Sequence, residues 1–167
     1  VRGAMTSGGM CGIDTIATRR TDVTINLPVL KDHGLSGVTL ALKNIAFGAY
    51  EHHRKAHDGN CDPYIAEACA HFWANVKVPL IVLDATSGCF DGGPRPSSRS
   101  SLWNEGAIYV ATDPVALDVV CRRVVMAQRR VRGLGDRTRD CLHIETAARK
   151  GLGVGDSSRI DLVTIQA

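Results

Sequence analysis

Residues 79–85 read PLIVLDA, a run in which every position between Pro79 and Asp84 is apolar. A strand with one face in solvent alternates apolar and polar side chains, whereas a strand covered on both faces is continuously apolar. The run therefore predicts a strand inside a layered, mainly parallel sheet. Asp84 follows the apolar residues directly, at the strand end where ligands bind in such sheets.

Strand and helix patterns alternate on either side of this run. Further strands are predicted at DVTINLPVL (22–30), GAIYVAT (106–112) and RIDLVTI (159–165). Helices are predicted over about 37–47 with Ser36 as N-cap, from Asp62-Pro63 to about 76, from Pro114 onward, and over about 137–150. A long Gly/Pro/Ser loop is predicted over residues 86–105. Alternation of this kind predicts an α/β fold whose layered, mainly parallel sheet is flanked by helices.

The bulk composition fits one globular domain. The chain has 167 residues, 44% of them hydrophobic, which is enough for a substantial core. Its net charge of +3 is well short of that of a dedicated nucleic-acid binder. No apolar run reaches the roughly 18 residues that a membrane-spanning helix needs. Because the chain begins with Val1, we expect a single domain over residues 1–167 that is part of a longer precursor or lacks an N-terminal half.

The cysteines are spread along the chain. There are 6 of them, and none forms a CxxC pair. Zinc ribbons and iron–sulfur clusters need closer spacing, so the chain has no autonomous cluster motif. Disulfide bonds are possible because the number of cysteines is even. However, Cys69, Cys121 and Cys141 lie in helical patterns with apolar neighbours, which favours buried free thiols.

Polar residues follow three of the predicted strands. The first strand runs into Lys31-Asp32-His33, the second ends at Asp84, and the third ends at Thr112-Asp113. In an open α/β sheet ligands bind at the carboxyl ends of strands, so parallel neighbours would bring these ends to one crevice under the 86–105 loop. Simpler roles stay open: Asp113 as a helix N-cap, Asp84 as a partner of loop amides, and His33 as a turn residue.

Lys43 is the single charge in the predicted helix GVTLALKNIAF, residues 37–47. A lysine in such surroundings extends to solvent, pairs with a carboxylate, or has a lowered pKa that suits acid/base or Schiff-base chemistry. We place it in the predicted catalytic set with His33, Asp84 and Asp113. The residues expected to bind substrate are Lys31, Asp118, Gly92 and Gly93.

Weaker patterns occur elsewhere in the chain. A metal could be held by His53, His57 and Cys61, but charged neighbours favour a solvated loop. His71 and His143 have no partner in sequence and are interpreted as helix-face residues. The arginines within residues 122–132 are not interleaved with aromatic side chains, which favours a solvated helix face over contact with nucleic acid.

Four segments together resemble the family catalogued as domain of unknown function 362. They are NLPVLKDHGLSGVTLALKNIAFG (26–48), CDPYIAEACA (61–70), LDATSGCFDGGPRP (83–96) and YVATDPVALDVV (109–120). They occur in the order expected for the family and define a core over about 22–125. The resemblance implies a link to redox proteins and to ferredoxin-like iron–sulfur modules. It also favours an exported or periplasmic location over a cytoplasmic one.

A more distant likeness connects the first segment to the nickel-pincer lactate racemase superfamily. In that superfamily a histidine works as the proton-transfer base, and a lysine ten positions on tethers the cofactor. Carried over by position, the likeness implies that His33 is the acid/base and that Lys43 is the anchoring amine. It also implies a nickel- or iron-containing cofactor.

These patterns predict proton-transfer or redox-linked chemistry on a small carboxylate-type substrate, in a polar crevice at strand ends. The alternative is a non-catalytic, redox-associated or structural subunit of a larger assembly. A small-molecule ligand and a protein partner or an oligomer are expected. Neither nucleic acid nor a membrane span is expected.

Overall fold

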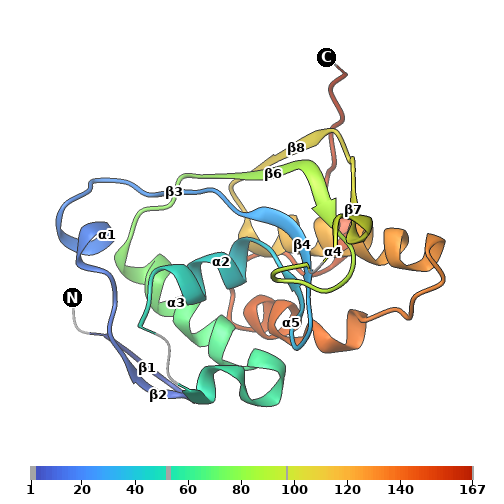
Figure 1. Cartoon of the computed structure of the whole chain (residues 1–167). Coiled ribbons are helices and arrows are strands. Elements are labelled where there is room, and N and C mark those ends of the chain that lie inside the picture. Colours follow the sequence, from blue (N-terminus) through green and yellow to red (C-terminus); the bar gives the residue numbers. More distant parts are fainter. Residues whose placement is uncertain (1–2, 52–53, 97, 167) are drawn as a thin grey trace.

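The computed structural model describes residues 3–51, 54–96 and 98–166, which form an α/β fold (Figure 1). The strands are β1 (Ala4–Thr6), β2 (Gly9–Cys11), β3 (Ile25–Asn26), β4 (Val29–His33), β5 (Gly37–Thr39), β6 (Leu80–Cys89), β7 (Leu102–Trp103) and β8 (Ala107–Ala111). The α-helices are α1 (Thr15–Arg19), α2 (Ala41–Gly48), α3 (Tyr64–Asn75), α4 (Pro114–Val131) and α5 (Leu142–Arg149). Short 3₁₀ segments lie at Arg54–Cys61, Arg99–Ser101, Thr138–Asp140 and Ser157–Arg159.

Strand β6 is the centre of the main sheet. Strands β3 and β4 pair with β6 in parallel, and β5 extends the sheet from β4 in the antiparallel sense. Strands β7 and β8 also pair with β6, both antiparallel. A separate hairpin is formed by β1 and β2. The apolar run at 79–85 lies in β6, and the predicted α/β class with a layered sheet is confirmed.

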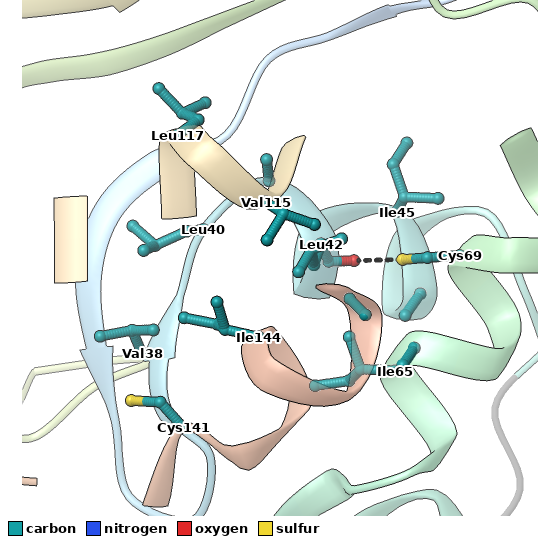
Figure 2. Close-up of a cluster of buried hydrophobic side chains, with 14 of the residues drawn as sticks. Val38, Leu40, Leu42, Ile45, Ile65, Cys69, Val115, Leu117, Cys141 and Ile144 are labelled. Atoms are coloured by element: carbon teal, nitrogen blue, oxygen red, sulfur yellow. Dashed lines mark hydrogen bonds between the residues drawn. The ribbon is translucent and has the colours of Figure 1, made fainter. Parts of the chain in front are cut away.

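The helices build the core against the sheet. Helices α2 and α4 contact the strands, and α3 and α5 pack against these two helices (Figure 1). The side chains of Ile81 and Leu83 on β6 are fully buried. Figure 2 shows how the helices meet in this core: Leu42 of α2, Ile65 of α3 and Ile144 of α5 lie in one cluster.

The opposite face of the sheet is open and mostly apolar, with the exposed carboxylate of Asp84 between Val29 and Ile108. Alternate residues of β3, β4 and β8 point away from the helices and are exposed: Ile25 (51%), Val29 (42%), Ile108 (63%) and Val110 (61%). Such faces are usually covered when a sheet contains parallel strands, because both faces of these strands are apolar. An exposed apolar patch of this kind is typical of an interaction surface.

The prediction of the first helix was partly wrong, and the prediction of its cap was wrong. Residues 37–39 form β5, so α2 begins only at Ala41. The hydroxyl of Ser36 does not cap the helix, because it donates a hydrogen bond to the carbonyl oxygen of Val38 at 3.0 Å. The strand predicted at 22–30 is divided into β3 and β4, with Pro28 between them.

The strand ends also differ from the prediction. Strand β6 continues to Cys89, into the predicted 86–105 loop, because β4 and β7 supply pairing partners there. The predicted strand 159–165 is not formed, since no strand of the described chain pairs with it. The last helix is shorter than predicted and covers Leu142–Arg149.

The cysteines follow the favoured prediction. Six are present, and each is free and buried. A search of the described residues for a helix long and apolar enough to cross a bilayer found none.

Candidate functional site

His33 lies at the end of β4 with its ring held in one orientation. Its Nδ1 accepts hydrogen bonds from the backbone N–H groups of Leu35 at 3.1 Å and Ser36 at 3.2 Å. An imidazole nitrogen that accepts cannot carry the proton, so the proton of the neutral ring is on Nε2. Burial, followed by the charge of Lys43, lowers the pKa of His33 to about 4. At neutral pH, His33 is therefore an uncharged ring that donates from Nε2.

Lys43 is buried on α2, with a thiol and an aromatic ring as its neighbours. Its Nζ lies 3.3 Å from Sγ of Cys61 and 3.7 Å from the centre of the Phe47 ring. Only 4% of the residue is exposed. Burial lowers the pKa of Lys43, and the contact with Cys61 opposes this shift. A buried lysine of this kind is suited to hold an anion or to react as an amine.

The chain segment that delivers Cys61 has an unusual backbone. Gly59, Asn60 and Cys61 all have positive φ, at 56°, 60° and 67°. Non-glycine residues adopt this region rarely and at a cost, and such strain is found preferentially at functional sites. The same segment carries His57, whose ring stacks on His33 with 6.4 Å between centroids. The stretch predicted as a solvated loop is thus partly packed against the site.

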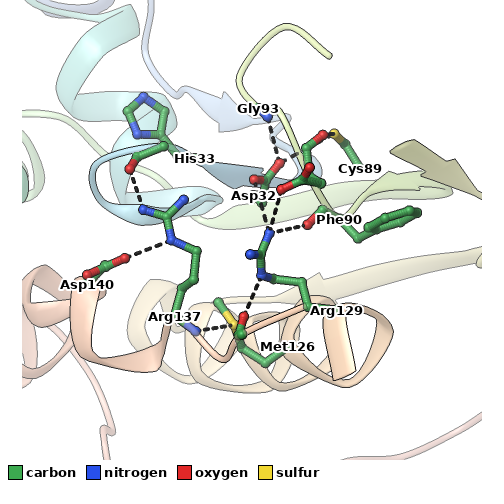
Figure 3. A network of polar contacts seen from close by, with 12 residues as sticks. Asp32, His33, Cys89, Phe90, Gly93, Met126, Arg129, Arg137 and Asp140 are labelled. Carbon is green, nitrogen blue, oxygen red and sulfur yellow. Dashed lines mark hydrogen bonds and ion pairs between the residues drawn. The ribbon is translucent and has the colours of Figure 1, made fainter. Parts of the chain in front are cut away.

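The electrostatic surroundings of His33 are positive. The charges that lower its pKa belong to Lys43, His57, Arg137 and Lys31. Arg137 also donates to the backbone oxygen next to His33, at Gly34 (Figure 3). A buried group surrounded by cations favours an anionic ligand such as a carboxylate. Lys31, which was predicted to bind substrate, lies within this positive region.

His143, on α5, is a further buried histidine of the helical layer. Its side chain is fully buried, and neither ring nitrogen has a hydrogen-bond partner among the described residues. Burial and the charges of Lys43, Arg122 and His33 lower the pKa of His143 to about 3. The sequence predicts His143 as a helix-face residue, and the structure shows that its side chain is buried. Its only signal in the sequence is its place beside the apolar Ile144.

Asp118 positions the helix that carries Lys43. Its two carboxylate oxygens accept from the first backbone N–H groups of α2, at Ala41 (2.8 Å) and Leu42 (3.2 Å). This is the role of a helix N-cap, supplied here from α4. Burial raises the pKa of Asp118 to about 7, although both N–H groups oppose the shift. Asp118 thus contacts the backbone that places Lys43, a role different from the predicted binding of substrate.

Gly93, one of the two predicted glycines, belongs to a neighbouring network around Asp32 (Figure 3). Gly92 has a positive φ of 76°, and the N–H of Gly93 donates to Oδ1 of Asp32 at 2.8 Å. A Cβ added to Gly93 would lie 2.1 Å from the backbone oxygen of Asp32, so only glycine fits. On the other side of Asp32, Arg129 approaches to 3.7 Å. This network fixes β4 immediately before His33.

Asp113 does not join His33, so the predicted meeting of three strand ends is wrong. Strand β8 is antiparallel to β6 and pairs its last residue, Ala111, with Ile81 near the start of β6. Asp113 therefore follows at the opposite end of the sheet from the end of β4. It caps α4, as the simpler alternative predicted, by accepting from Val115 and Ala116 at 2.8 Å each.

Asp84 also lies apart from the cluster. It pairs with Val29 within β6 rather than ending the strand, and it is exposed. Its Oδ1 accepts from the backbone N–H and the hydroxyl of Thr86, at 2.9 Å and 2.7 Å, and these bonds lower the pKa of Asp84. This geometry agrees with the simpler alternative, in which Asp84 is a partner of loop amides.

Two of the three weak metal candidates, His57 and Cys61, have other residues as their neighbours. His53 lies outside the described residues. His57 contacts His33 and Phe47, whereas Cys61 contacts Lys43. Among residues 3–51, 54–96 and 98–166, no group of three or more His, Cys, Asp or Glu side chains is placed to hold a metal ion.

A family comparison covers the part of the chain that carries this site. Residues 15–123 match the family model described as a domain of unknown function, DUF362. The chain belongs to the DUF362 family. The DUF362 match includes His33, Lys43, Cys61 and Asp118, whereas His143 lies beyond it. Comparisons with curated proteins and with solved structures gave no match.

Proposed function

We propose that this DUF362 chain catalyses proton transfer at a carbon next to the carbonyl or carboxylate group of a small acid. Lys43 holds the anionic end of the substrate, and His33 donates a hydrogen bond from Nε2 to the oxygen on which negative charge develops. The observation that carries the proposal is the buried ring of His33, which two backbone N–H groups hold in one orientation. Burial and the charge of Lys43 lower the pKa of His33, which supports a neutral ring. Preorganised donors of this kind stabilise enolate-like charge.

The proposed role of His33 differs from the base implied by the racemase likeness. With Nδ1 occupied by two backbone N–H groups, the neutral ring has no free lone pair to take a proton. Protonation of Nδ1 would break both hydrogen bonds, and the low pKa opposes it. These contacts support His33 as a donor and leave the proton acceptor to another group.

The proposal is tested by solvent hydrogen exchange into pyruvate and 2-oxobutyrate. In heavy water, proton NMR should show protein-dependent loss of the C3 hydrogens of these acids. Lys43→Met keeps the length of the side chain and removes its charge, and we expect it to slow the exchange about 100-fold or more. Lys77→Met, at an exposed lysine on the surface, is the matched control and should exchange like the wild type. Absence of protein-dependent exchange in the wild type would reject the proposed reaction.

A second candidate function is supported by the open face of the sheet. The exposed side chains of Ile25, Val29, Ile108 and Val110 make this sheet face mostly apolar, although Asp84 lies among them. The chain would then be a structural subunit, and two copies would cover each other's sheets. Apolar surface of this kind gains free energy when it is removed from water.

This alternative predicts self-association through the sheet face. The purified chain should sediment as a dimer, and the double variant Ile108→Lys/Val110→Lys should sediment as a monomer. Val131→Lys places a charge at another exposed apolar residue, at the end of α4, and should leave the dimer intact. A wild-type chain that stays monomeric at high concentration contradicts the alternative.

A further inference from the structure

We propose that residues 159–165, the C-terminal arm, are exchanged between two copies of the chain and that each arm pairs as a strand with β8 of the other copy. The inference does not rest on the proposed proton transfer. It goes beyond contact between two sheet faces, because it names the strand that joins the copies. Two observations carry it: an extended segment without backbone hydrogen bonds, and a groove that this segment and β8 line together.

The C-terminal arm has the composition of a strand but lacks the pairing of one. Its sequence, RIDLVTI, is rich in apolar and β-branched residues and predicts a strand. Among the described residues, none donates a hydrogen bond to the backbone of 161–166 or accepts one from it. Leu162, Val163 and Ile165 are 59%, 74% and 88% exposed. Unpaired backbone beside exposed apolar side chains favours pairing with another chain.

The base of the arm is held against α4. The 3₁₀ segment Ser157–Arg159 contacts this helix, and Ile160 packs against the hydrophobic core. Just before the base, the N–H of Val154 donates to Oδ2 of Asp113, the N-cap of α4, at 2.8 Å. Beyond the base, the arm extends past β8 and away from the rest of the fold (Figure 1). A segment that is held at its base and extends outward is placed to reach a second molecule.

Strand β8 forms the other wall of a groove beside the arm. It pairs with β6 along one edge, and no strand of the described chain pairs with its second edge. The groove has a volume of about 1150 Å³ and is lined by all residues of β8 and by residues 159–166. Both walls therefore contain extended backbone with free hydrogen-bonding groups. An inserted strand satisfies such groups along its whole length, as in other cases of strand addition to a sheet edge.

The arm of a second copy is the occupant that fits this groove by symmetry. A two-fold axis between the arms places each arm in the groove of the other copy, between β8 and the arm of that copy. The strand order across the dimer is then β8, partner arm, own arm and partner β8, with the two arms antiparallel. Such an interface is isologous and closed, as in most homodimers. One chain supplies both the free strand and the free edge, so no other partner is needed.

The first test places two prolines in the arm. Proline has no N–H, and successive N–H groups of a strand point to opposite edges, so Leu162→Pro/Val163→Pro removes a donor from each edge. The wild type should sediment as a dimer and the proline variant as a monomer. Both residues are exposed, so the substitutions remove no core contact. The matched control Leu162→Ile/Val163→Ile keeps both N–H groups and the apolar surface, and it should remain a dimer.

Two sedimentation results would overturn the inference. One is a wild-type chain that stays monomeric at high concentration. The other is a dimer that the two prolines leave intact, because association through the sheet faces alone does not need the backbone of the arm. Neither result bears on the proposed proton transfer, which is measured by hydrogen exchange into pyruvate.

A second measurement uses the wild type and distinguishes exchange between copies from pairing within one copy. Chain labelled with ¹⁵N and deuterated at carbon is mixed with unlabelled chain. Nuclear Overhauser contacts from labelled amide protons of β8 to Hα protons then arise only between copies. We expect such contacts to the Hα protons of the arm in the dimer. A dimer in which these contacts are missing would show that the arm does not pair with β8 of the other copy, and the inference would be wrong.

Discussion

Replacing Arg129 with methionine should lower the free energy of unfolding by about 3–5 kcal/mol. The guanidinium donates to the carbonyl oxygen of Phe90 at 2.7 Å and to Asp91 at 3.0 Å, and it lies 3.7 Å from Oδ2 of Asp32 (Figure 3). Asp32 is 1% exposed, and in the described chain this oxygen has no hydrogen-bond partner. Without Arg129 the buried carboxyl group loses its compensating charge. Urea unfolding of the wild type and of Arg129→Met measures the difference in the free energy of unfolding.

Arg130 is the matched control on the same helix. Its guanidinium pairs with Asp136 at 3.2 Å, but 62% of its side chain is exposed. Exposed ion pairs contribute little, so Arg130→Met should change stability by less than about 1 kcal/mol. Because Asp32 causes the loss, the double variant Asp32→Asn/Arg129→Met should regain part of it. Equal stabilities for Arg129→Met and Arg130→Met would show that Asp32 does not need the guanidinium.

Elements with strong local signals were predictable from the sequence. The apolar run after Pro79 gave β6, and the Asp113-Pro114 pair placed the start of α4 at the observed residue. Asp62-Pro63 located the start of α3 within one residue. At α4 the capping carboxylate of Asp113 and the missing N–H of Pro114 determine the local backbone, whereas Asp62 does not cap α3, whose N-cap is Pro63. Such signals do not depend on distant parts of the chain.

Local sequence signals could not predict the direction of β8 or the set of residues that forms the site. Pairing direction depends on which strand β8 meets, and its antiparallel register with β6 places Asp113 away from His33. Lys43 could be singled out because a lone charge in an apolar helix is a local signal. Asp32 had a usable signal: it shares a strand face with the buried Leu30.

Asp118→Asn should remove a pH dependence of stability between about pH 4 and pH 7. Burial raises the pKa of Asp118 from its ordinary 3.8 to about 7, so in this range the folded state binds the proton more tightly than the unfolded state. Stability from this group is therefore complete below about pH 4 and is lost as the pH rises through about 7. A shift of this size corresponds to about 4 kcal/mol. Asparagine stays neutral and keeps one oxygen for the N–H of Ala41.

Urea unfolding at several pH values between 4 and 8 separates the two states of Asp118. The wild type should lose about 4 kcal/mol more than Asp118→Asn over this range, whereas Asp161→Asn, on the exposed C-terminal segment, should follow the wild type. Parallel curves for wild type and Asp118→Asn would mean that the carboxylate is charged throughout and that the N-terminus of α2 holds it. A pH-dependent difference would instead mean that burying the charged carboxylate costs more free energy than its hydrogen bonds with the N–H groups of Ala41 and Leu42 return.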